Sequence, residues 1–247
     1  MTNPWPSDTA IVIPAFRAAD LLLQLLPRVK ESVPPENIVV VDDASGDSTP
    51  QLCSELGVSC LRHHVNRGKG SALLTGFHHC ITGGSRWIIS MDADGQHSPD
   101  DLPKFIAASR QQPAPGICIG ARSMQPGIMP FERILSNRLT SGILGILAGI
   151  PIVDSQCGYR LYSTRLLEAT DIEYRRFEME SEIILKAAFI GFPVTFTGIQ
   201  TLYLKGPSHI SHVADTIRWI TAVLRIRSQR QRIIRHYRQK STDKAAT

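Results

Sequence analysis

The sequence contains no paired cysteine motif. Its five cysteines are odd in number and scattered, and no two of them are separated by only two residues. This pattern argues against a structural zinc site and against a disulfide framework. We therefore expect reduced thiols in a cytoplasmic compartment.

Long apolar runs are also absent. The longest one, residues 141–153, is shorter than the roughly 20 residues that a membrane-spanning helix requires. The opening stretch, MTNPWPSDTA, has no basic segment followed by an apolar one, so no signal peptide is expected. We predict a soluble or peripheral protein without a transmembrane anchor.

Two common nucleotide-binding motifs are missing as well. No G-x-G-x-x-G follows the first apolar run, which disfavours a dinucleotide site. The stretch NRGKGS lacks P-loop spacing, because His63 stands where the first glycine would be. Any nucleotide site must therefore use other residues.

What the first half does contain is a regular alternation of apolar runs and helical patterns. The apolar runs occupy residues 10–16, 37–43, 58–64, 87–94 and 116–122. Such alternation predicts an α/β fold, with a mostly parallel central sheet and helices on both faces. Hydrophobic residues make up 43% of the 247, which is enough for the core of one large domain.

Carboxylates follow two of these runs. Asp42 and Asp43 end one, and Asp92 and Asp94 end another, where parallel sheets bind their ligands. If strand geometry continues through them, Asp92 and Asp94 point to one side, and Gln96 adds a carbonyl oxygen. That set suits Mg²⁺ or Mn²⁺ shared with substrate phosphates. A solvated turn that caps the next helix is the alternative for so short a motif.

Six stretches, taken in order, resemble family-2 inverting glycosyltransferases of the glycosyltransferase-A fold. They are VIPAF, VVDDASGDST, NRGKGSALLTG, MDADGQHSPDDL, IGAR and DSQCGYRLY. The likeness spans about residues 10–196 and is greatest to the dolichol-phosphate (polyprenyl-phosphate) mannosyl- and glucosyltransferases. It implies a Rossmann-like nucleotide half, a nucleoside-diphosphate sugar donor and a divalent metal. It also implies a hexosyltransferase that often uses a lipid-phosphate acceptor.

The resemblance assigns roles on the donor side. Asp92, Asp94 and Gln96 match the family's metal-binding D-A-D-x-Q, and Asp94 is thereby a catalytic candidate. The remaining donor-side positions match residues around the nucleotide: Pro14, Phe16, Asp42 and Lys69. The family's usual P-x-Y-N-E is PAFRAAD here, which leaves the donor sugar and nucleotide open.

The resemblance also assigns roles on the acceptor side. Arg122, Arg133 and Asn137 match positions that face the acceptor phosphate, although a serine usually stands at position 137. Arg160 is a further phosphate-binding candidate, unless it pairs with Asp154.

A hydroxyl acceptor would need a general base. The candidates are Asp154 and the glutamates of FEMESE, chiefly Glu182. His209 is a candidate metal ligand, and His212 is its alternative.

The C-terminus is strongly basic. Residues 215–240 read as one amphipathic helix with eight lysine and arginine residues: Arg218, Arg225, Arg227, Arg230, Arg232, Arg235, Arg238 and Lys240. Such a helix binds an anionic membrane surface or packs on its own domain. Nucleic acid is disfavoured because no aromatic-rich face accompanies the arginines.

Together these features predict a catalytic domain at residues 1–212 and a basic helix and tail at 213–247. The donor half is expected at about 8–122 and the acceptor half at 123–212. We expect a metal-dependent inverting transferase at the inner face of the cytoplasmic membrane, acting on a polyprenyl-phosphate-like acceptor. The alternatives are a hydroxyl acceptor with a Glu or Asp base, and a non-catalytic membrane-binding relative. A sugar-nucleotide pyrophosphorylase is disfavoured, because PAFRAAD is not a glycine-rich basic loop.

Overall fold

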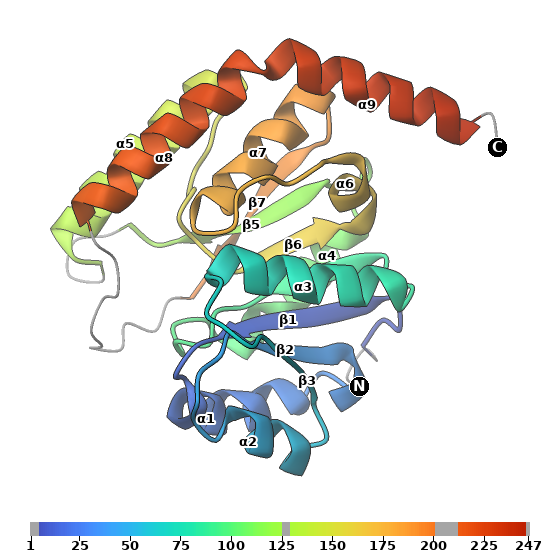
Figure 1. Ribbon diagram of the computed structural model, residues 1–247, viewed down its shortest axis with the longest axis vertical. Coiled ribbons are helices and arrows are strands. Elements are labelled where there is room, and N and C mark those ends of the chain that lie inside the picture. Colours follow the sequence, from blue (N-terminus) through green and yellow to red (C-terminus); the bar gives the residue numbers. More distant parts are fainter. Residues whose placement is uncertain (1–4, 125–128, 201–211, 246–247) are drawn as a thin grey trace.

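The described residues form one seven-stranded sheet (Figure 1). The computed structural model describes residues 5–124, 129–200 and 212–245. The strands run in the spatial order β3-β2-β1-β4-β6-β5-β7. Their bounds are β1 Thr9–Ala15, β2 Ile38–Asp42, β3 Ser59–Arg62, β4 Trp87–Ser90, β5 Ile117–Arg122, β6 Arg160–Ser163 and β7 Val194–Ile199.

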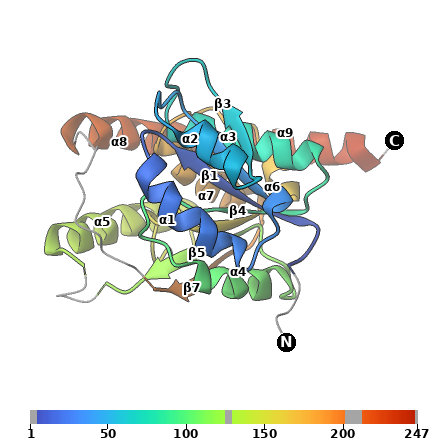
Figure 2. The same ribbon diagram turned by 90° about the horizontal axis from the view of Figure 1, so that it is seen from below.

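Helices cover both faces of the sheet, with α3 on one face and α4 on the other (Figures 1 and 2). The helices are α1 Ala19–Lys30, α2 Thr49–Glu55, α3 Lys69–Thr82, α4 Leu102–Ser109, α5 Phe131–Ala148, α6 Thr164–Ala169, α7 Glu178–Ile190, α8 His212–Ser228 and α9 Arg230–Ala245. Short 3₁₀ turns at Pro35–Asn37 and Pro99–Asp101 precede β2 and α4. The predicted α/β fold is confirmed.

The sheet is parallel except for β6. Strands β3, β2, β1 and β4 form a parallel Rossmann-like half. Strand β6 runs antiparallel between β4 and β5, and β7 is again parallel to β5. Strand β5 therefore belongs, by its pairing, with the strands of the second half, although the sequence groups it with the first.

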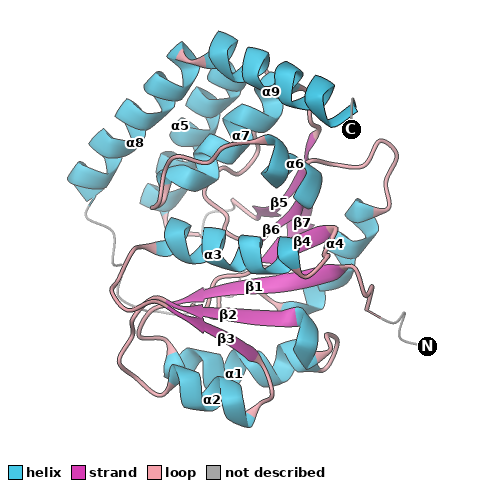
Figure 3. Cartoon of the chain, turned by 45° about the vertical axis from the view of Figure 1, so that its right-hand side comes forward, coloured by secondary structure: helices cyan, strands magenta, loops and turns pink. Residues whose placement is uncertain are grey.

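Burial explains why these segments form these elements. Every residue of β2 is buried, as expected for a strand covered on both faces. Helix α1 buries Leu22, Leu25, Leu26 and Val29, which recur at helical spacing. The carboxyl ends of β1, β2 and β4 are thereby fixed at one edge of the sheet (Figure 3).

A second apolar cluster lies beside the sheet. Helices α5 and α8 both pack against α7, through Leu144 and Ala148 on α5 and Val223 and Ile226 on α8. Both helices extend beyond the sheet on the same side (Figure 1). Within the described residues, no helix is both long enough and apolar enough to cross a membrane.

The basic C-terminal segment is two helices rather than the single one predicted. Helix α8 ends at Ser228 and α9 begins at Arg230. Gln229 joins them and turns the chain, so that α9 leaves in a different direction (Figure 3). The apolar residues of α8 lie on two different sides of the helix. Val223 and Ile226 are buried, whereas Ile217 and Leu224 are 60% and 56% exposed.

Candidate active site

Asp42 is the last residue of β2, and one of its two carboxylate oxygens accepts no hydrogen bond from the described residues. Its Oδ1 accepts a hydrogen bond from the backbone N–H of Ser45 at 2.9 Å. Its Oδ2 lies 3.3 Å from Nε of Arg62 but has no hydrogen-bond partner among the described residues. A buried oxygen left without a donor is costly, so this atom suits a donor group of a bound nucleotide. Pro14 is half-buried and Phe16 is exposed, and both lie at the end of the neighbouring strand β1.

The loops that follow β1 and β2 have unusual backbone conformations. Arg17 and Ala44 adopt φ values of 52° and 63°, in the left-handed region that side chains other than glycine rarely adopt. The backbone N–H of Arg17 donates to the Ser45 hydroxyl at 2.9 Å, which ties the two loops together. Backbone strain of this kind gathers at functional sites.

Asp92, Lys69 and Glu180 form a compact charged cluster. Lys69 Nζ lies 2.7 Å from Asp92 Oδ1 and 3.2 Å from Glu180 Oε1. Burial alone would lower the pKa of Lys69, but the two carboxylates outweigh it and raise that pKa. Burial alone would raise the pKa of Asp92, but Lys69 holds it below the ordinary value. Lys69 and Asp92 are therefore both charged at neutral pH.

Gly158 makes this cluster possible. A Cβ on Gly158 would meet Asp92 Oδ2, and it would lie only 2.7 Å from Lys69 Nζ. Without a side chain there, the two ionic groups pack directly on the backbone before β6.

Arg160, predicted to bind the acceptor, is instead a structural residue. It is fully buried and donates to the carbonyl oxygens of Cys157, Ser155 and Glu180 at 2.6, 2.8 and 3.0 Å. With no exposed surface, it fixes the backbone under the cluster.

The metal candidates are close in sequence but differ in exposure. Strand β4 ends at Ser90, so strand geometry does not continue through Asp92 and Asp94 as the sequence had suggested. Asp94 is exposed and accepts from the backbone N–H of Gln96 at 3.0 Å, while Asp92 faces Lys69. Among the described residues, no three Asp, Glu, His or Cys side chains gather closely enough to hold a metal by themselves. Two carboxylates and an amide fit a hard cation that takes its remaining ligands from a diphosphate.

His97 braces this loop. Its Nδ1 accepts from the backbone N–H of Asp92 at 3.2 Å, and its ring stacks on Tyr159 with centroids 5.0 Å apart. Burial lowers the pKa of His97, so the imidazole is neutral at neutral pH.

Asp154, a predicted base, is fully engaged in hydrogen bonds. Arg122 donates to it from Nε at 2.8 Å and from NH2 at 3.0 Å, and Asn137 donates at 2.7 Å. Burial alone would raise the pKa of Asp154, but these donors outweigh it and lower that pKa. A buried carboxylate with a lowered pKa is a poor proton acceptor. Asp154 instead fixes Arg122 and Asn137.

Glu182, the other predicted base, is also structural. It has no exposed surface, accepts from the backbone N–H groups of Glu173 and Tyr174 at about 2.9 Å, and lies 2.7 Å from Lys186 Nζ. It anchors the segment before α7. The glutamate that reaches the cluster is Glu180, two residues earlier.

The described structure leaves the predicted roles of Arg133, His209 and His212 untested. Arg133 is exposed on the first turns of α5. His209 lies outside the described residues, and the side chain of His212 is likewise not described. Their predicted roles stay predictions.

Sequence reasoning missed the contribution of Asp43. Its carboxylate accepts from the backbone N–H groups of Arg67 and Gly68 at 2.9 and 2.7 Å. It also lies 2.6 Å from His63 Nδ1, while His63 Nε2 contacts Thr75. Asp43 thus holds the loop that delivers Lys69, and only its position beside Asp42 hinted at this role.

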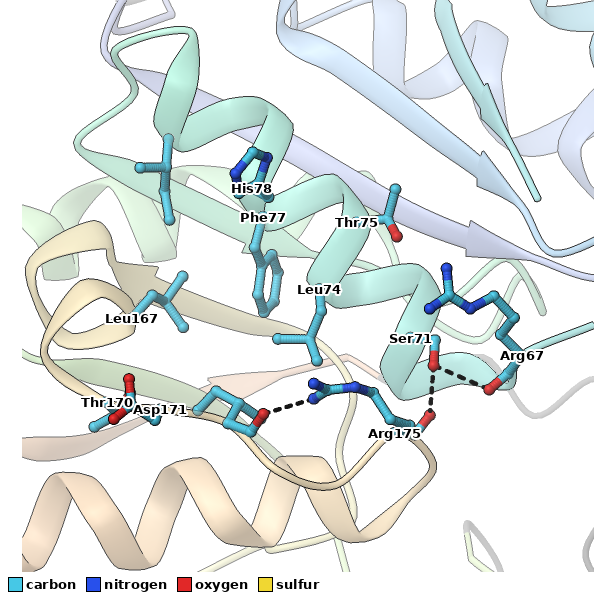
Figure 4. A pocket seen from close by; sticks show the side chains of 12 residues that line it. Arg67, Ser71, Leu74, Thr75, Phe77, His78, Leu167, Thr170, Asp171 and Arg175 are labelled. Carbon is cyan, nitrogen blue, oxygen red and sulfur yellow. Dashed lines mark hydrogen bonds between the residues drawn. The ribbon is translucent and has the colours of Figure 1, made fainter. Parts of the chain in front are cut away.

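Two cavities formed by described residues lie near the cluster, and none of the predicted site residues within the described ranges lines either of them. The larger, about 600 Å³, runs along α3 opposite Leu167 (Figure 4). Arg67 and Arg175 stand at one end of it, and Leu74 and Phe77 line its length (Figure 4). The smaller, about 470 Å³, lies between residues 173–178 and α8.

Comparison with known proteins identifies the family. Residues 10–170 match the family model described as glycosyl transferase family 2. The chain belongs to this family. The resemblance seen in the sequence is thereby confirmed, and the protein is a family-2 glycosyltransferase.

Several relatives of this glycosyltransferase are known. An uncharacterised protein of Methanocaldococcus jannaschii is 33% identical over 200 residues, which cover 79% of this chain and 82% of the relative. The polyprenol monophosphomannose synthase of Mycolicibacterium smegmatis is 29% identical over 76% of this chain and 77% of its own. The dolichol-phosphate mannosyltransferase of Pyrococcus furiosus is 28% identical over 88% of this chain and 66% of its own.

Solved structures confirm the glycosyltransferase-A fold. The glucosyl-3-phosphoglycerate synthase of Mycobacterium tuberculosis, crystallised with Mn²⁺, uridine diphosphate and glucosyl-3-phosphoglycerate, matches with a TM-score of 0.71. The identity is 15%, and the match covers 89% of this glycosyltransferase and 80% of that chain. At this identity the likeness establishes the fold alone.

Proposed function

We propose that the protein transfers a hexose from a nucleoside-diphosphate sugar to the phosphate of a lipid such as polyprenyl phosphate. The observation that carries the proposal is the cluster of Asp92, Lys69 and Glu180 at the carboxyl edge of the sheet. It lies where the strand order reverses between β1 and β4, the place at which such folds bind nucleotides. The relatives named for polyprenol and dolichol phosphates support the choice of acceptor.

The donor is held from two sides. Asp42 offers its unused oxygen to the nucleoside, beside Pro14 and Phe16. Lys69 offers a positive charge to the diphosphate. Because Asp43 fixes the backbone of Arg67 and Gly68, Lys69 is held in place before the donor arrives.

A divalent cation fits the same edge. Asp92 and Asp94, with Gln96, would hold Mg²⁺ or Mn²⁺ against the donor diphosphate. When bound, such an ion neutralises charge that develops on the leaving diphosphate. Complexes of the M. tuberculosis synthase with either ion support this cofactor.

The chemistry is a displacement with inversion. An acceptor oxygen forms a bond to the anomeric carbon, while the bond from that carbon to the diphosphate breaks and its electron pair leaves with the nucleoside diphosphate. A phosphate monoester is already ionised at neutral pH, so it needs positive side chains rather than a base. The engaged states of Asp154 and Glu182 favour this route over a hydroxyl acceptor.

Membrane association accompanies a lipid acceptor. Helix α5 exposes Phe131, Leu135, Leu139 and Ile146 at helical spacing, and α8 exposes Ile217, Ile220 and Leu224. Basic residues dominate α8 and α9. Apolar and basic surface together suit a helix lying on an anionic membrane. We place the protein peripherally, at the inner face of the cytoplasmic membrane.

A transfer assay tests this function. The full chain is incubated with Mn²⁺ and radiolabelled UDP- or GDP-hexoses, with either a polyprenyl phosphate or the matching polyprenol in detergent. We expect label in the lipid only with the phosphate, and none after chelation of the metal. Transfer to the polyprenol would support the hydroxyl-acceptor alternative, and no transfer from any donor would support a non-catalytic role.

A further inference from the structure

The imidazole of His63 bridges the residue after β2 and the helix α3. His63 directly follows β3, and its side chain is buried. Its Nδ1 lies 2.6 Å from Oδ1 of Asp43, and its Nε2 lies 2.9 Å from the hydroxyl oxygen of Thr75 on α3 (Figure 4). Because both ring nitrogens have partners, the ring is held in one orientation, and it keeps Asp43 and α3 at a fixed separation.

The partners of His63 decide the direction of both hydrogen bonds. The Asp43 carboxylate accepts from the backbone N–H groups of Arg67 and Gly68 at 2.9 and 2.7 Å, so it acts as an acceptor. Nδ1 of His63 is therefore the nitrogen that donates to Asp43, which leaves a lone pair on Nε2. The Thr75 hydroxyl donates to that lone pair. The hydroxyl thus belongs to the same chain of hydrogen bonds as the donor loop.

This chain of hydrogen bonds holds Lys69 from two sides. Lys69 is the first residue of α3. The preceding residue, Gly68, has a φ of 89° and no side chain to limit its rotation, so its restraint comes from Asp43. His63 holds the second turn of the same helix through Thr75. A helix held at its start and at its second turn resists rotation, so the Lys69 ammonium keeps its place in the charged cluster.

The nucleoside acid Asp42 is held separately. Its carboxylate accepts from the backbone N–H of Ser45 at 2.9 Å. His63 meets Asp42 through the backbone, where the His63 N–H donates to the Asp42 carbonyl at 2.9 Å. A change of the His63 or Thr75 side chain should therefore displace Lys69 and leave Asp42 in place.

We propose that His63 and Thr75 are positioning residues of the transferase. They act through Asp43 and α3 to hold the Lys69 ammonium where the donor diphosphate binds, and they contact neither the donor nor the acceptor. This inference rests on the proposed function, in which Lys69 binds the diphosphate. It adds two residues that lie outside the predicted site.

Binding of a nucleoside diphosphate and of its parent nucleoside separates positioning from folding. The probes are UDP or GDP with Mn²⁺, whichever binds the wild type more tightly, and the matching uridine or guanosine. Calorimetry measures the diphosphate, and ligand-observed NMR measures the weaker nucleoside. One variant, Thr75→Val, replaces the hydroxyl by a methyl group of similar size. The other, His63→Asn, keeps a donor near the position of Nδ1 and removes Nε2.

The matched controls are Thr82→Val and His64→Asn. Thr82 lies at the end of α3, where its hydroxyl donates to carbonyl oxygens of its own helix. His64 is exposed and follows His63 directly. The conservative variant Thr75→Ser keeps the hydroxyl. Thermal unfolding confirms that each variant is folded.

We expect Thr75→Val and His63→Asn to bind the diphosphate about tenfold more weakly and the nucleoside as the wild type does, because a displaced ammonium loses a charge-assisted contact. Thr75→Ser and both controls should bind both probes as the wild type does. In a Lys69→Met background, Thr75→Val should cause no further loss, because the side chain that it positions is gone.

Three results would overturn the proposal. They are a nucleoside affinity that falls as much as the diphosphate affinity, a loss in Thr82→Val equal to that in Thr75→Val, and a full further loss in the Lys69→Met background.

Transfer kinetics separate this inference from the proposed function. If diphosphate binding depends on Thr75 but the wild type transfers no sugar, the function fails while the positioning role stands. If Thr75→Val transfers sugar with an unchanged donor KM and kcat, the positioning role fails while the function stands.

Discussion

At the scale of single residues, Lys69 sets the charge balance of the site. Its ammonium group lies between the carboxyl groups of Asp92 and Glu180, at the end of a loop fixed by Asp43. A divalent cation at Asp92 must share that carboxylate with the ammonium, and like charges at such distances repel strongly. The negative charge of a diphosphate relieves the repulsion. Metal and donor should therefore bind together more readily than either binds alone.

Asp94→Asn should strongly weaken metal-dependent nucleotide binding and leave the fold intact. Asp94 is exposed and makes one local hydrogen bond, so its change has little effect on packing. Loss of one anionic ligand should weaken UDP binding in Mn²⁺ by on the order of 100-fold. Calorimetry with and without Mn²⁺ measures this. Asp100→Asn, also at an exposed carboxylate, is the control, and equal affinities for the two variants would refute the metal assignment.

Asp154→Asn should lower stability in a pH-dependent way. The folded-state pKa of Asp154 lies below its ordinary value, so its stabilising effect is present above about pH 4 and is lost as pH falls through the folded pKa. Near neutral pH, the free energy of unfolding of the wild type should exceed that of the variant by about 3 kcal/mol. That difference should shrink on acidification.

Urea unfolding between pH 3 and 7 measures this difference. For Asp100→Asn the difference from the wild type should be small, because that side chain is 76% exposed. If the stability difference between the wild type and Asp154→Asn grows on acidification, the lowered pKa of Asp154 in the folded state is contradicted.

The sequence alone identified the carboxylates at the strand ends but not the roles of neighbouring acids. Glu180 and Glu182 lie in one acidic stretch, yet residues two apart on a helix point in different directions. Only the packing of α7 decides that Glu180 meets Lys69 and Glu182 meets the backbone. Likewise, nothing local to Asp154 reveals Arg122, which lies 32 residues earlier in the chain.

At the scale of elements, apolar runs predicted the strands of the first half well. The runs at residues 10–16 and 37–43 become β1 and β2. The antiparallel direction of β6 could not be predicted, because RLYS is short and carries no periodic signal. The end of α8 could not be predicted either, because no glycine or proline lies next to Gln229.

Gly158→Ala should disrupt the site more than the fold. Its methyl group would overlap Asp92 and Lys69, and overpacking of this kind costs about 1–3 kcal/mol. The ionic pair should separate, so we expect UDP affinity in Mn²⁺ to fall by about tenfold or more. Calorimetry and thermal unfolding measure both effects.

Gly142→Ala is the matched control for this change. Gly142 lies within α5 with open space around its Cα, and alanine there should stabilise the helix by about 0.5–1 kcal/mol. UDP affinity should stay unchanged in the control. Wild-type affinity in Gly158→Ala would show that the close approach to Gly158 is unimportant.

At the scale of the whole molecule, charge is concentrated on α8 and α9, at one end of the structure (Figure 1). Helices α5 and α8, which carry exposed apolar residues, lie toward that same end (Figure 1). The opposite end, formed by α1 and α2, lies farthest from this surface (Figure 1). Under the proposed function, the end that carries α8 and α9 is the one that would face a membrane.

The full chain should sediment with anionic vesicles in a salt-dependent manner. Replacing Arg232, Arg235 and Arg238 by Gln should weaken this binding by roughly 1 kcal/mol for each charge near the surface. Replacing Arg28, Arg86 and Arg110, none of which lies on α8 or α9, should have little effect. Equal sedimentation with neutral and anionic vesicles, or equal losses of binding in the two triple variants, would contradict the proposal that α8 and α9 bind an anionic membrane.

The pairing of β5 has a consequence for how the chain matures on the ribosome. Strands β1 to β4 can form their parallel sheet as soon as they emerge, because each pairs within that group. Among the described strands, β5 pairs with β6 and β7 alone, which are synthesised about 40 and 70 residues later. During that interval the apolar strand β5 has no pairing partner in the nascent chain. Exposed strand edges of this kind promote aggregation. Slow translation between β5 and β7 should therefore harm the yield of folded protein more than an equal delay after β7.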